Sequence, residues 1–358
     1  MLSVEALTDR QRISSLAPEW DRLCRVSHQP AHQLEYGHMS LWFDTFFKEW
    51  RPLVLVVRND KEVLGILPLK YRDEKRRNIL PFRRVRMMNY GASDFSALLA
   101  PPENTVSVVD AAFTWLFDSG FRWELFIVDD VIEGNVALPA IRSWLAGRTA
   151  AHSVTEGRYF YIDLARPWED IVADMHSKFI VRNVTKARNR ITKAGAWEVL
   201  KNPGWDSQTI VREAAALHIL RQDELKRESF FKAEESLHLL QRAVEYYLDR
   251  GMFSAYWLMF QGTPIAYNLG FVQAGVFYGW NMAFHPDFAQ FDPSKLLLFE
   301  TIRDFHQQGL QEFSFGRGEG DYKTKWTSSC RVNYRLDITN TSTVYGRFLS
   351  FIERRLAA

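Results

Sequence analysis

The order of predicted elements repeats in the two halves of this 358-residue chain. In each half, two β-rich runs form a hairpin, a third strand follows, and a helix with a glycine stop leads into a buried strand. These elements cover residues 52–130 in the first half and 252–316 in the second. The two sequences are not alike, so the halves share an order of elements, which indicates one α/β unit built twice.

Composition sets the class of protein. Hydrophobic residues make up 47% and charged residues 25% of the chain, which is typical of a soluble globular protein, and the length suggests two domains. We expect these at 1–165 and 166–358, the second including the connecting helices. The formal net charge is only +2, so any attraction for anions is local. Two cysteines, no apolar leader and no long apolar run predict a cytoplasmic protein.

Residues 167–195, 205–224 and 231–251 read as helices between the halves. On the first of them, Ile180, Val184, Ala187 and Ile191 form an apolar stripe suited to a core. The other face carries Lys178, Arg182, Lys186 and Arg190, each four residues after the last. Like charges at this spacing repel each other. A solvated helix face and a phosphate or nucleic-acid contact are the two interpretations.

Residues 315–326, FGRGEGDYKTKW, contain the densest group of side chains that could bind a ligand or take part in catalysis. Glycines 316, 318 and 320 alternate with Arg317 and Glu319, and Asp321, Tyr322, Lys323 and Lys325 follow. Alternating glycines let backbone N–H groups converge or a ligand approach closely. The alternative is a glycine-rich turn with exposed charges.

Weaker signals lie elsewhere. Asp292 and Pro293 suit the start of a helix, and a helix N-terminus is a ready anion site. His218 and Arg221 are one turn apart on an otherwise apolar helix, where a core histidine is the alternative. Asp94 follows a strand end near Tyr90, and turn capping is the alternative there. The sequence has no metalloprotease, Walker, serine-hydrolase or CxxC motif.

The run from Phe291 to Trp326 resembles the C-terminal signature of GNAT-superfamily acetyltransferases associated with cellulose or exopolysaccharide biosynthesis. Positions 315, 318, 322, 323 and 326 match, and GASDFSALL (91–99) is similar to a first-half segment of that group. The group is similar to the Fem-type peptidyltransferases, whose catalytic lysine corresponds to Lys325. Ser314 and Ser294 stand where the group has Asp and Gly, and its pyrophosphate loop is not visible.

The resemblance implies two tandem GNAT-like domains, each a mixed and mostly antiparallel sheet flanked by helices. It also implies an acyltransferase that uses acyl-CoA, acetyl-CoA or longer, and no metal. The expected acceptor is an amine or hydroxyl of a sugar-like, lipid- or nucleotide-linked precursor of the cell envelope or of exopolysaccharide. Proteins of envelope or polysaccharide biosynthesis are the expected partners.

Direct attack on a thioester needs a proton acceptor, an acid for the thiolate and groups that position the substrates. The predicted catalytic residues are Glu319, Asp321, Tyr322, Lys325 and His218. The predicted substrate-binding residues are Asp94, Tyr90, Arg221, Arg317 and Lys323. The predicted donor-binding residues are Arg182, Lys186, Ser294 and Lys295.

Two other functions stay open. One is an aminoacyl-tRNA-dependent transferase, which the basic helix face favours and which would make tRNA a partner. The other is a non-catalytic binding or scaffold subunit, which the serines at 294 and 314 favour.

Overall fold

The computed structural model describes residues 2–28, 32–46, 49–76, 80–88, 95–148, 151–175, 177–348 and 351. The chain divides into two compact units. Unit 1 comprises residues 1–157 and 332–358, and unit 2 comprises residues 158–331. The domain boundary expected at 165/166 stays a prediction. No helix within the described ranges is long and apolar enough to cross a membrane.

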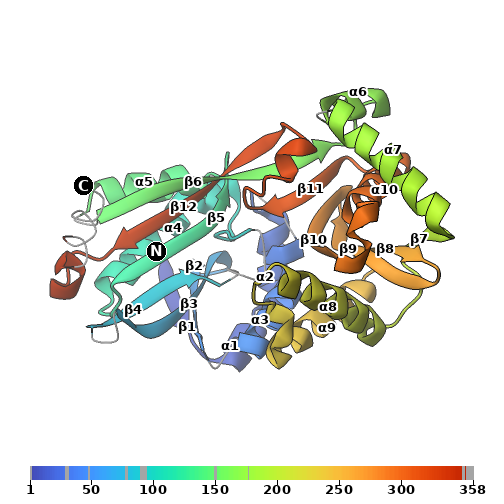
Figure 1. The fold of residues 1–358 in the computed structure, drawn as a ribbon. Helices are drawn as coiled ribbons and strands as arrows, with labels where there is room; N and C mark the ends of the chain where they lie inside the picture. Colours follow the sequence, from blue (N-terminus) through green and yellow to red (C-terminus); the bar gives the residue numbers. More distant parts are fainter. Residues whose placement is uncertain are drawn as a thin grey trace. The chain divides into compact units, whose positions relative to one another are not determined.

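Unit 1 is a mostly antiparallel sheet with helices (Figure 1). Its strands lie in the order β1 (Ser3–Leu7), β2 (Arg51–Arg58), β3 (Val63–Arg76), β4 (Leu80–Met87), β5 (Leu125–Ile132) and β12 (Cys330–Thr339), with only β4 and β5 parallel among the described pairs. Its helices are α1 (Arg10–Ser14), α2 (Ala17–Val26), α3 (Tyr36–Phe46), α4 (Thr105–Asp118) and α5 (Ala137–Ala146).

Both faces of the unit 1 sheet are covered. Leu53, Leu55 and Val57 of β2 pack in one core with buried residues of α4 and α5, and the alternate residues Val54 and Val56 are also buried. A strand with two buried faces reads as a continuous apolar run, as residues 52–57 do.

Unit 2 repeats the architecture. Its strands lie in the order β6 (Ala151–Asp163), β11 (Glu312–Arg317), β10 (Val276–Phe284), β9 (Thr263–Gln273), β8 (Phe253–Phe260) and β7 (Trp197–Lys201), and β10 and β11 are parallel. The unit boundaries cut β6 and β12. Its helices are α6 (Trp168–Asp174), α7 (Ser177–Ala194), α8 (Ser207–Glu224), α9 (Glu234–Leu248) and α10 (Pro293–Gln307).

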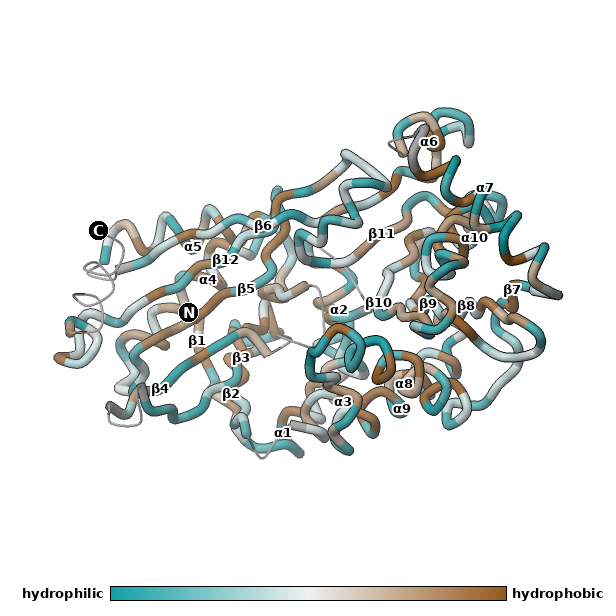
Figure 2. Tube along the Cα trace, viewed as in Figure 1, coloured by the Kyte–Doolittle hydropathy of each residue, from teal (hydrophilic) through white to brown (hydrophobic). Residues whose placement is uncertain are grey.

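Each face of the unit 2 sheet has its own core. The apolar stripe of α7, at 180, 184, 187 and 191, is buried against one face together with α10, as predicted. Buried residues of α8 and α9 pack on the other face. Figure 2 shows α7 as a largely hydrophilic helix outside this stripe.

The predicted order of elements is confirmed in both units. Strands β2, β3 and β4 lead through α4 to β5, and β8, β9 and β10 lead through α10 to β11. In each unit the helix connects the two parallel strands, as a crossover requires. The predicted fold class, a mixed and mostly antiparallel α/β protein of two such units, is therefore confirmed.

Candidate functional site

A cavity of about 610 Å³ lies within unit 2, beyond the place where β10 and β11 pair. Their parallel register runs from Val276 opposite Glu312 to Tyr278 opposite Ser314. The rest of β10, Gly279 to Phe284, lines the cavity on one side, and Phe313, Phe315, Tyr322 and Trp326 line it on the other. Parallel strands that separate at their carboxyl ends leave a crevice in which ligands bind.

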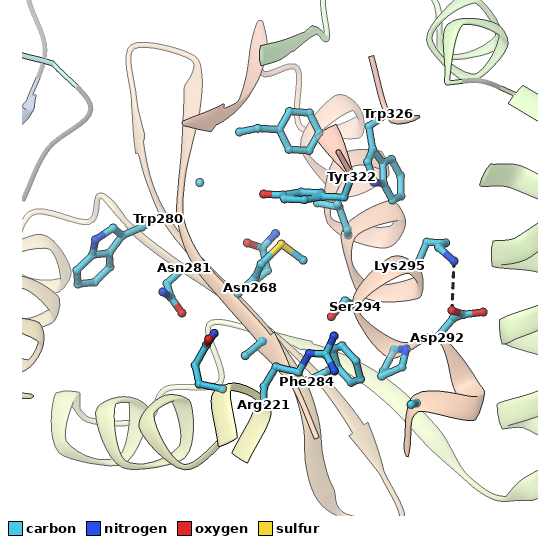
Figure 3. Close-up of a pocket in the computed structure, with 18 of the residues that line it drawn as sticks. Arg221, Asn268, Trp280, Asn281, Phe284, Asp292, Ser294, Lys295, Tyr322 and Trp326 are labelled. Atoms are coloured by element: carbon cyan, nitrogen blue, oxygen red, sulfur yellow. Dashed lines mark hydrogen bonds and ion pairs between the residues drawn. The ribbon is translucent and has the colours of Figure 1, made fainter. Parts of the chain in front are cut away.

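A β-bulge shapes one wall of this cavity. The register between β9 and β10 shifts between Gly279 and Asn281, which inserts Trp280 as an extra residue. The Trp280 ring lies 5.1 Å from the Phe271 ring, and the Asn281 side chain accepts a hydrogen bond from the Tyr267 hydroxyl. Trp280 and Asn281 are both among the residues that line the cavity (Figure 3).

The start of α10 forms a second wall. Asp292 is the N-cap with a left-handed backbone (φ 48°), but its carboxylate does not cap the helix. Instead it pairs with Arg190 of α7 at 2.8 Å and with Lys295 at 3.2 Å. Pro293, Ser294 and Lys295 line the cavity, so the positive end of the helix dipole lies beside it, while the Lys295 ammonium is directed at Asp292 (Figure 3).

The glycine-rich turn is built around Lys323. Gly316, near the end of β11, and Gly318, directly after the strand, have φ angles of 68° and 96°, which favour glycine. Lys323 is buried, and its Nζ donates to the carbonyl oxygens of Gly316 at 2.9 Å and Arg317 at 2.7 Å. Tyr322 is thereby held with its phenol oxygen pointing into the cavity, as Figure 3 shows.

Gly320 and Ser314 complete the support of this turn. A Cβ atom on Gly320 would lie 3.0 Å from the Tyr322 ring, so the glycine lets the ring lie close to the backbone. The Ser314 hydroxyl donates to the Tyr159 hydroxyl at 2.6 Å and accepts from the Gly316 N–H at 3.1 Å. The serine that replaces the expected aspartate is therefore a buried anchor of the turn.

Arg221 reaches the cavity from α8. Its guanidinium carbon lies 4.4 Å from the centre of the Phe284 ring, and its side chain also pairs with Glu224. This stacking fixes the guanidinium beside an aromatic wall (Figure 3).

Four of the residues predicted from the sequence line the cavity: Tyr322, Arg221, Ser294 and Lys295. Glu319, Asp321 and Lys325 are exposed and are not among its lining residues, and Arg317 and Lys323 also lie outside the lining. Arg182 and Lys186 are exposed on α7. Tyr90 and Asp94 lie outside the described residues. The roles proposed for all of these residues stay predictions.

His218 lies in the core between α8 and the following turn. Its Nδ1 is 2.8 Å from the Ser229 hydroxyl, and its ring packs edge-on against Phe231 with centroids 4.8 Å apart. Burial lowers the pKa of His218 below its ordinary value. These contacts are those of the core histidine that the sequence left open as an alternative, and His218 is not among the cavity-lining residues.

The cavity is also lined by residues that no pattern in the sequence indicated. Asn268, Trp280, Asn281 and Phe284 line it, together with Gln222 of α8. The available signal was a single asparagine in the otherwise apolar run PIAYNLGFVQ (264–273). A polar residue there is informative only once the packing shows that it is buried.

Residues 178–324 match the family model described as an acetyltransferase (GNAT) domain. This segment of unit 2 is therefore similar to a GNAT domain. The match contains the whole cavity lining up to Tyr322, and the expected enzyme class, a GNAT-type acyltransferase, is confirmed. The GNAT domain implies an acyl-CoA donor. The exopolysaccharide-associated group within the superfamily is not confirmed.

Solved structures extend the similarity of fold over both units. A crystal structure of FemX is 12% identical to this chain and has a TM-score of 0.61. The match covers 94% of this chain and 98% of the FemX chain. A conserved protein of unknown function from Bacteroides thetaiotaomicron is 9% identical and has a TM-score of 0.50. The match covers 95% of this chain and 100% of that protein's chain. At these identities the likeness concerns the fold alone. No curated protein matches the sequence significantly.

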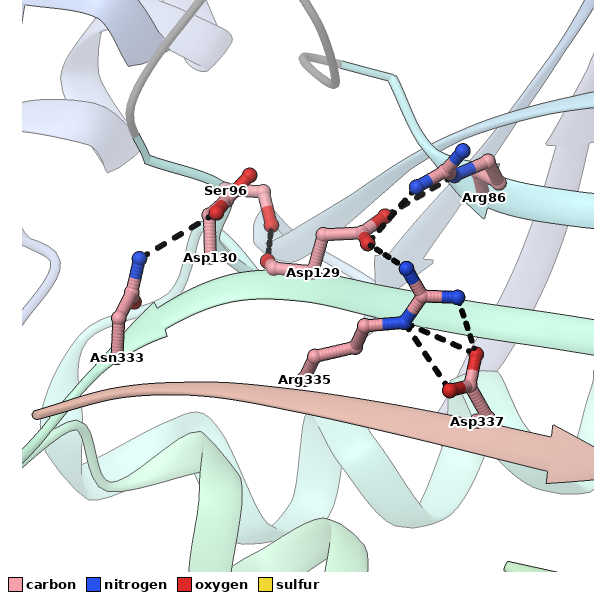
Figure 4. A network of polar contacts seen from close by, with 7 residues as sticks. All are labelled: Arg86, Ser96, Asp129, Asp130, Asn333, Arg335 and Asp337. Atoms are coloured by element: carbon pink, nitrogen blue, oxygen red, sulfur yellow. Dashed lines mark hydrogen bonds and ion pairs between the residues drawn. The ribbon is translucent and has the colours of Figure 1, made fainter. Parts of the chain in front are cut away.

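In unit 1, the corresponding parallel strands β4 and β5 are connected by a buried ion pair. Arg86 of β4 donates to the Asp129 carboxylate of β5 at 2.8 and 3.1 Å, and both side chains are buried. Arg335 approaches Asp129 to 3.8 Å and pairs with Asp337 (Figure 4). Breaking one partner of a buried pair leaves an uncompensated charge, so this network holds β4, β5 and β12 in place.

Proposed function

We propose that the unit 2 cavity binds the acyl end of an acyl-CoA, and that the acyl group passes to an amine or hydroxyl of a sugar-like precursor of the cell envelope or of exopolysaccharide. The observation that carries the proposal is the cavity between the separated ends of β10 and β11, beside the start of α10, within the segment that matches a GNAT domain.

The residues at the start of α10 fit a phosphate-bearing donor. Lys295 lies in the first turn of the helix, and Arg190 lies 2.8 Å from Asp292, so two cations surround one carboxylate. Residues Pro286–Phe291 form a 3-10 helix in place of a glycine-rich loop. We therefore assign the phosphate contacts to side-chain cations and to the helix N-terminus rather than to a loop of backbone N–H groups.

Tyr322 is the acid in this proposal. The acceptor nitrogen or oxygen forms a bond to the acyl carbon, the carbon–sulfur bond breaks, and the thiolate takes a proton from the Tyr322 hydroxyl. Asp292 is the only carboxylate among the described residues that line the cavity, and it is ion-paired. The proton of the acceptor therefore leaves to water, which suits an amine that attacks in its neutral form, and the Tyr322 phenolate regains its proton from water.

The acceptor class is proposed from the side chains of β10 and α8 that line the cavity. Trp280 and Phe284 offer aromatic faces, while Arg221, Gln222 and Asn281 offer polar groups beside them. Such a mixture of aromatic surface and a few placed polar groups is typical of sites that orient a small polar molecule.

Donor binding is tested by thermal unfolding with acetyl-CoA, longer acyl-CoAs and free CoA. We expect a saturable rise in Tm, because a ligand that binds only the native state stabilises it by mass action. For Lys295→Glu, the ligand concentration that gives half of the maximal rise in Tm should increase at least fivefold. For Lys325→Glu, at an exposed lysine outside the lining, this concentration should stay unchanged. No rise with any CoA species would reject the donor assignment.

Acid catalysis is tested with Tyr322→Phe. Thiol release from acetyl-CoA in the presence of amino sugars should slow by about 10²-fold, the scale of general acid catalysis, while the Kd for acetyl-CoA stays within about twofold. Equal turnover in this variant and the wild type would remove Tyr322 from the mechanism.

A second candidate, an aminoacyl-tRNA-dependent transferase, is favoured by two observations. Arg182, Lys186 and Lys193 are exposed cations on α7, and the fold is similar to that of FemX. Phosphate contacts along such a helix give affinity that falls with salt.

A further inference from the structure

Asn268 is a buried amide that faces the cavity without satisfying its donor. Asn268 is 3% exposed and belongs to the cavity lining. Within the part of the chain that the structure describes, its Nδ2 has no hydrogen-bond partner. An asparagine amide carries two N–H donors, so the donors of Asn268 are available to a ligand in the cavity.

The neighbours of Asn268 explain why the protein does not satisfy it. Asn268 lies opposite Met282 on β10 and Tyr256 on β8. Met282 offers only a thioether, which is a weak acceptor. The Tyr256 hydroxyl donates to Asp304, and burial with this hydrogen bond raises the pKa of Tyr256. Gly270, two residues further along β9, has no side chain to contribute.

Keeping this amide costs the unliganded protein stability. A buried donor without an acceptor loses its hydrogen bonds to water, whereas an apolar side chain of the same shape would be nearly neutral or stabilising. Natural sites that give up stability in this way are commonly those that bind a ligand.

The walls near Asn268 restrict what can supply the acceptor. Met282, Leu298 and Phe313 line the same cavity and belong to or pack against the apolar core between the sheet and α10. Figure 3 shows the Asn268 amide in the middle of the view, between Tyr322 and Ser294. An alkyl chain that carries one oxygen fits such a place better than a fully hydrated group does.

We infer that Asn268 is a specificity-determining residue that donates a hydrogen bond from Nδ2 to an oxygen of the bound acyl group. The inference rests on the proposed function, since it places the acyl end of acyl-CoA in this cavity. The oxygen is either the thioester carbonyl or a hydroxyl or oxo group further along the acyl chain. Fully reduced alkyl groups leave the donor unsatisfied and bind more weakly.

The test measures Kd by calorimetry for two matched ligand pairs and for free CoA. S-ethyl-CoA differs from acetyl-CoA by lacking the carbonyl oxygen, and butyryl-CoA differs from 3-hydroxybutyryl-CoA by lacking the chain hydroxyl. We expect the oxygen-bearing member of at least one pair to bind about tenfold more tightly. A preference in the first pair identifies the carbonyl, and a preference in the second identifies the chain oxygen.

The variant Asn268→Leu removes the donor and keeps the approximate shape. It should bind both members of each pair equally, keep the wild-type affinity for free CoA, and show a higher Tm than the wild type without ligand. The control Asn189→Leu, at an exposed position of α7, should change neither the pair preference nor the affinity for CoA.

Three results would overturn the inference. If free CoA binds but the wild type discriminates in neither pair, the inference fails and the proposed donor stands. If Asn268→Leu lowers the Tm of the unliganded protein, Asn268 is a structural residue. If no CoA species binds the wild type, the proposed function fails and the inference fails with it.

Discussion

The ammonium group of Lys323 stabilises the glycine turn from inside. Although the sequence suggests a ligand for this lysine, its side chain is 4% exposed and donates to two backbone carbonyl groups. Lys323→Met should therefore leave buried carbonyl oxygens without a donor and destabilise the protein by about 2–4 kcal/mol, measured by urea unfolding.

Lys325 supplies the matched control for this change. It follows two residues later and is exposed, so Lys325→Met should alter the free energy of unfolding by less than about 0.5 kcal/mol. Equal losses in both variants would show that the hydrogen bonds of Lys323 add nothing to stability.

His218 should make stability depend on pH. Burial lowers its pKa in the folded protein, so below about pH 6.5 the unfolded state binds a proton that the folded state binds less readily. Stability contributed by the neutral imidazole is thus lost as the pH falls. The glutamine of His218→Gln does not titrate. The Tm of the wild type should therefore fall relative to the Tm of this variant as the pH is lowered from 7.5 to 5.

The same variant separates a core histidine from a catalytic one. His218→Gln keeps a polar group near Ser229 and should retain acyl transfer at pH 7.5. Parallel Tm curves across this pH range, or loss of turnover with CoA binding intact, would contradict the structural role.

At the scale of elements, the close approach of β9 and β10 depends on Gly270. A Cβ atom there would lie 2.4 Å from the Phe277 ring and 2.4 Å from the Tyr278 carbonyl oxygen, both in the strand that continues into the bulge. Gly270→Ala should destabilise the protein by about 2–4 kcal/mol and weaken CoA binding, since the bulge that lines the cavity must shift.

Gly157→Ala, in β6, is the control for Gly270→Ala. The nearest atom to its added Cβ is the Asn333 carbonyl oxygen at 4.0 Å, so the change should cost less than about 1 kcal/mol in a urea titration. If Gly270→Ala unfolds at the same urea concentration as the wild type, the close packing of the two strands does not matter to stability.

Local patterns in the sequence predicted the elements that bury an apolar face. The stripe of α7 and the hairpins β2–β3 and β8–β9 were recognised because their periodicity is contained in one segment. The strands β6 and β12 were missed. Their residues pair with partners far along the chain, such as Tyr334 with Val131, and no local turn signals announce them.

The candidate site shows the same limit. Tyr322 was predicted because glycines and charges gather around it in one stretch of sequence. Asn268 was not predicted as a site residue, because it becomes buried and lines the cavity only when β9, β10 and α10 pack together. Lys323 was assigned to a ligand because the sequence cannot show that its charge is directed at the carbonyl groups of its own turn.

At the scale of the whole molecule, the question is whether the basic face of α7 serves a nucleic acid. The net charge of +2 offers no general attraction for RNA. Arg190 of this basic face is paired with Asp292, and the neighbouring Arg188 is paired with Glu300, so residues of unit 2 itself neutralise part of the positive charge of α7. The side chain of Lys178 lies outside the described residues.

We therefore expect no functional binding of tRNA. Filter binding should give a weak Kd that rises steeply with salt, and at about 150 mM salt Lys186→Glu should differ from the wild type by less than twofold. The exposed Lys325→Glu is the matched charge reversal on another surface of unit 2. If tRNA still binds at this salt, and Lys186→Glu alone weakens it by fivefold or more, the donor is an aminoacyl-tRNA, because only a built phosphate contact on α7 would distinguish the two lysines.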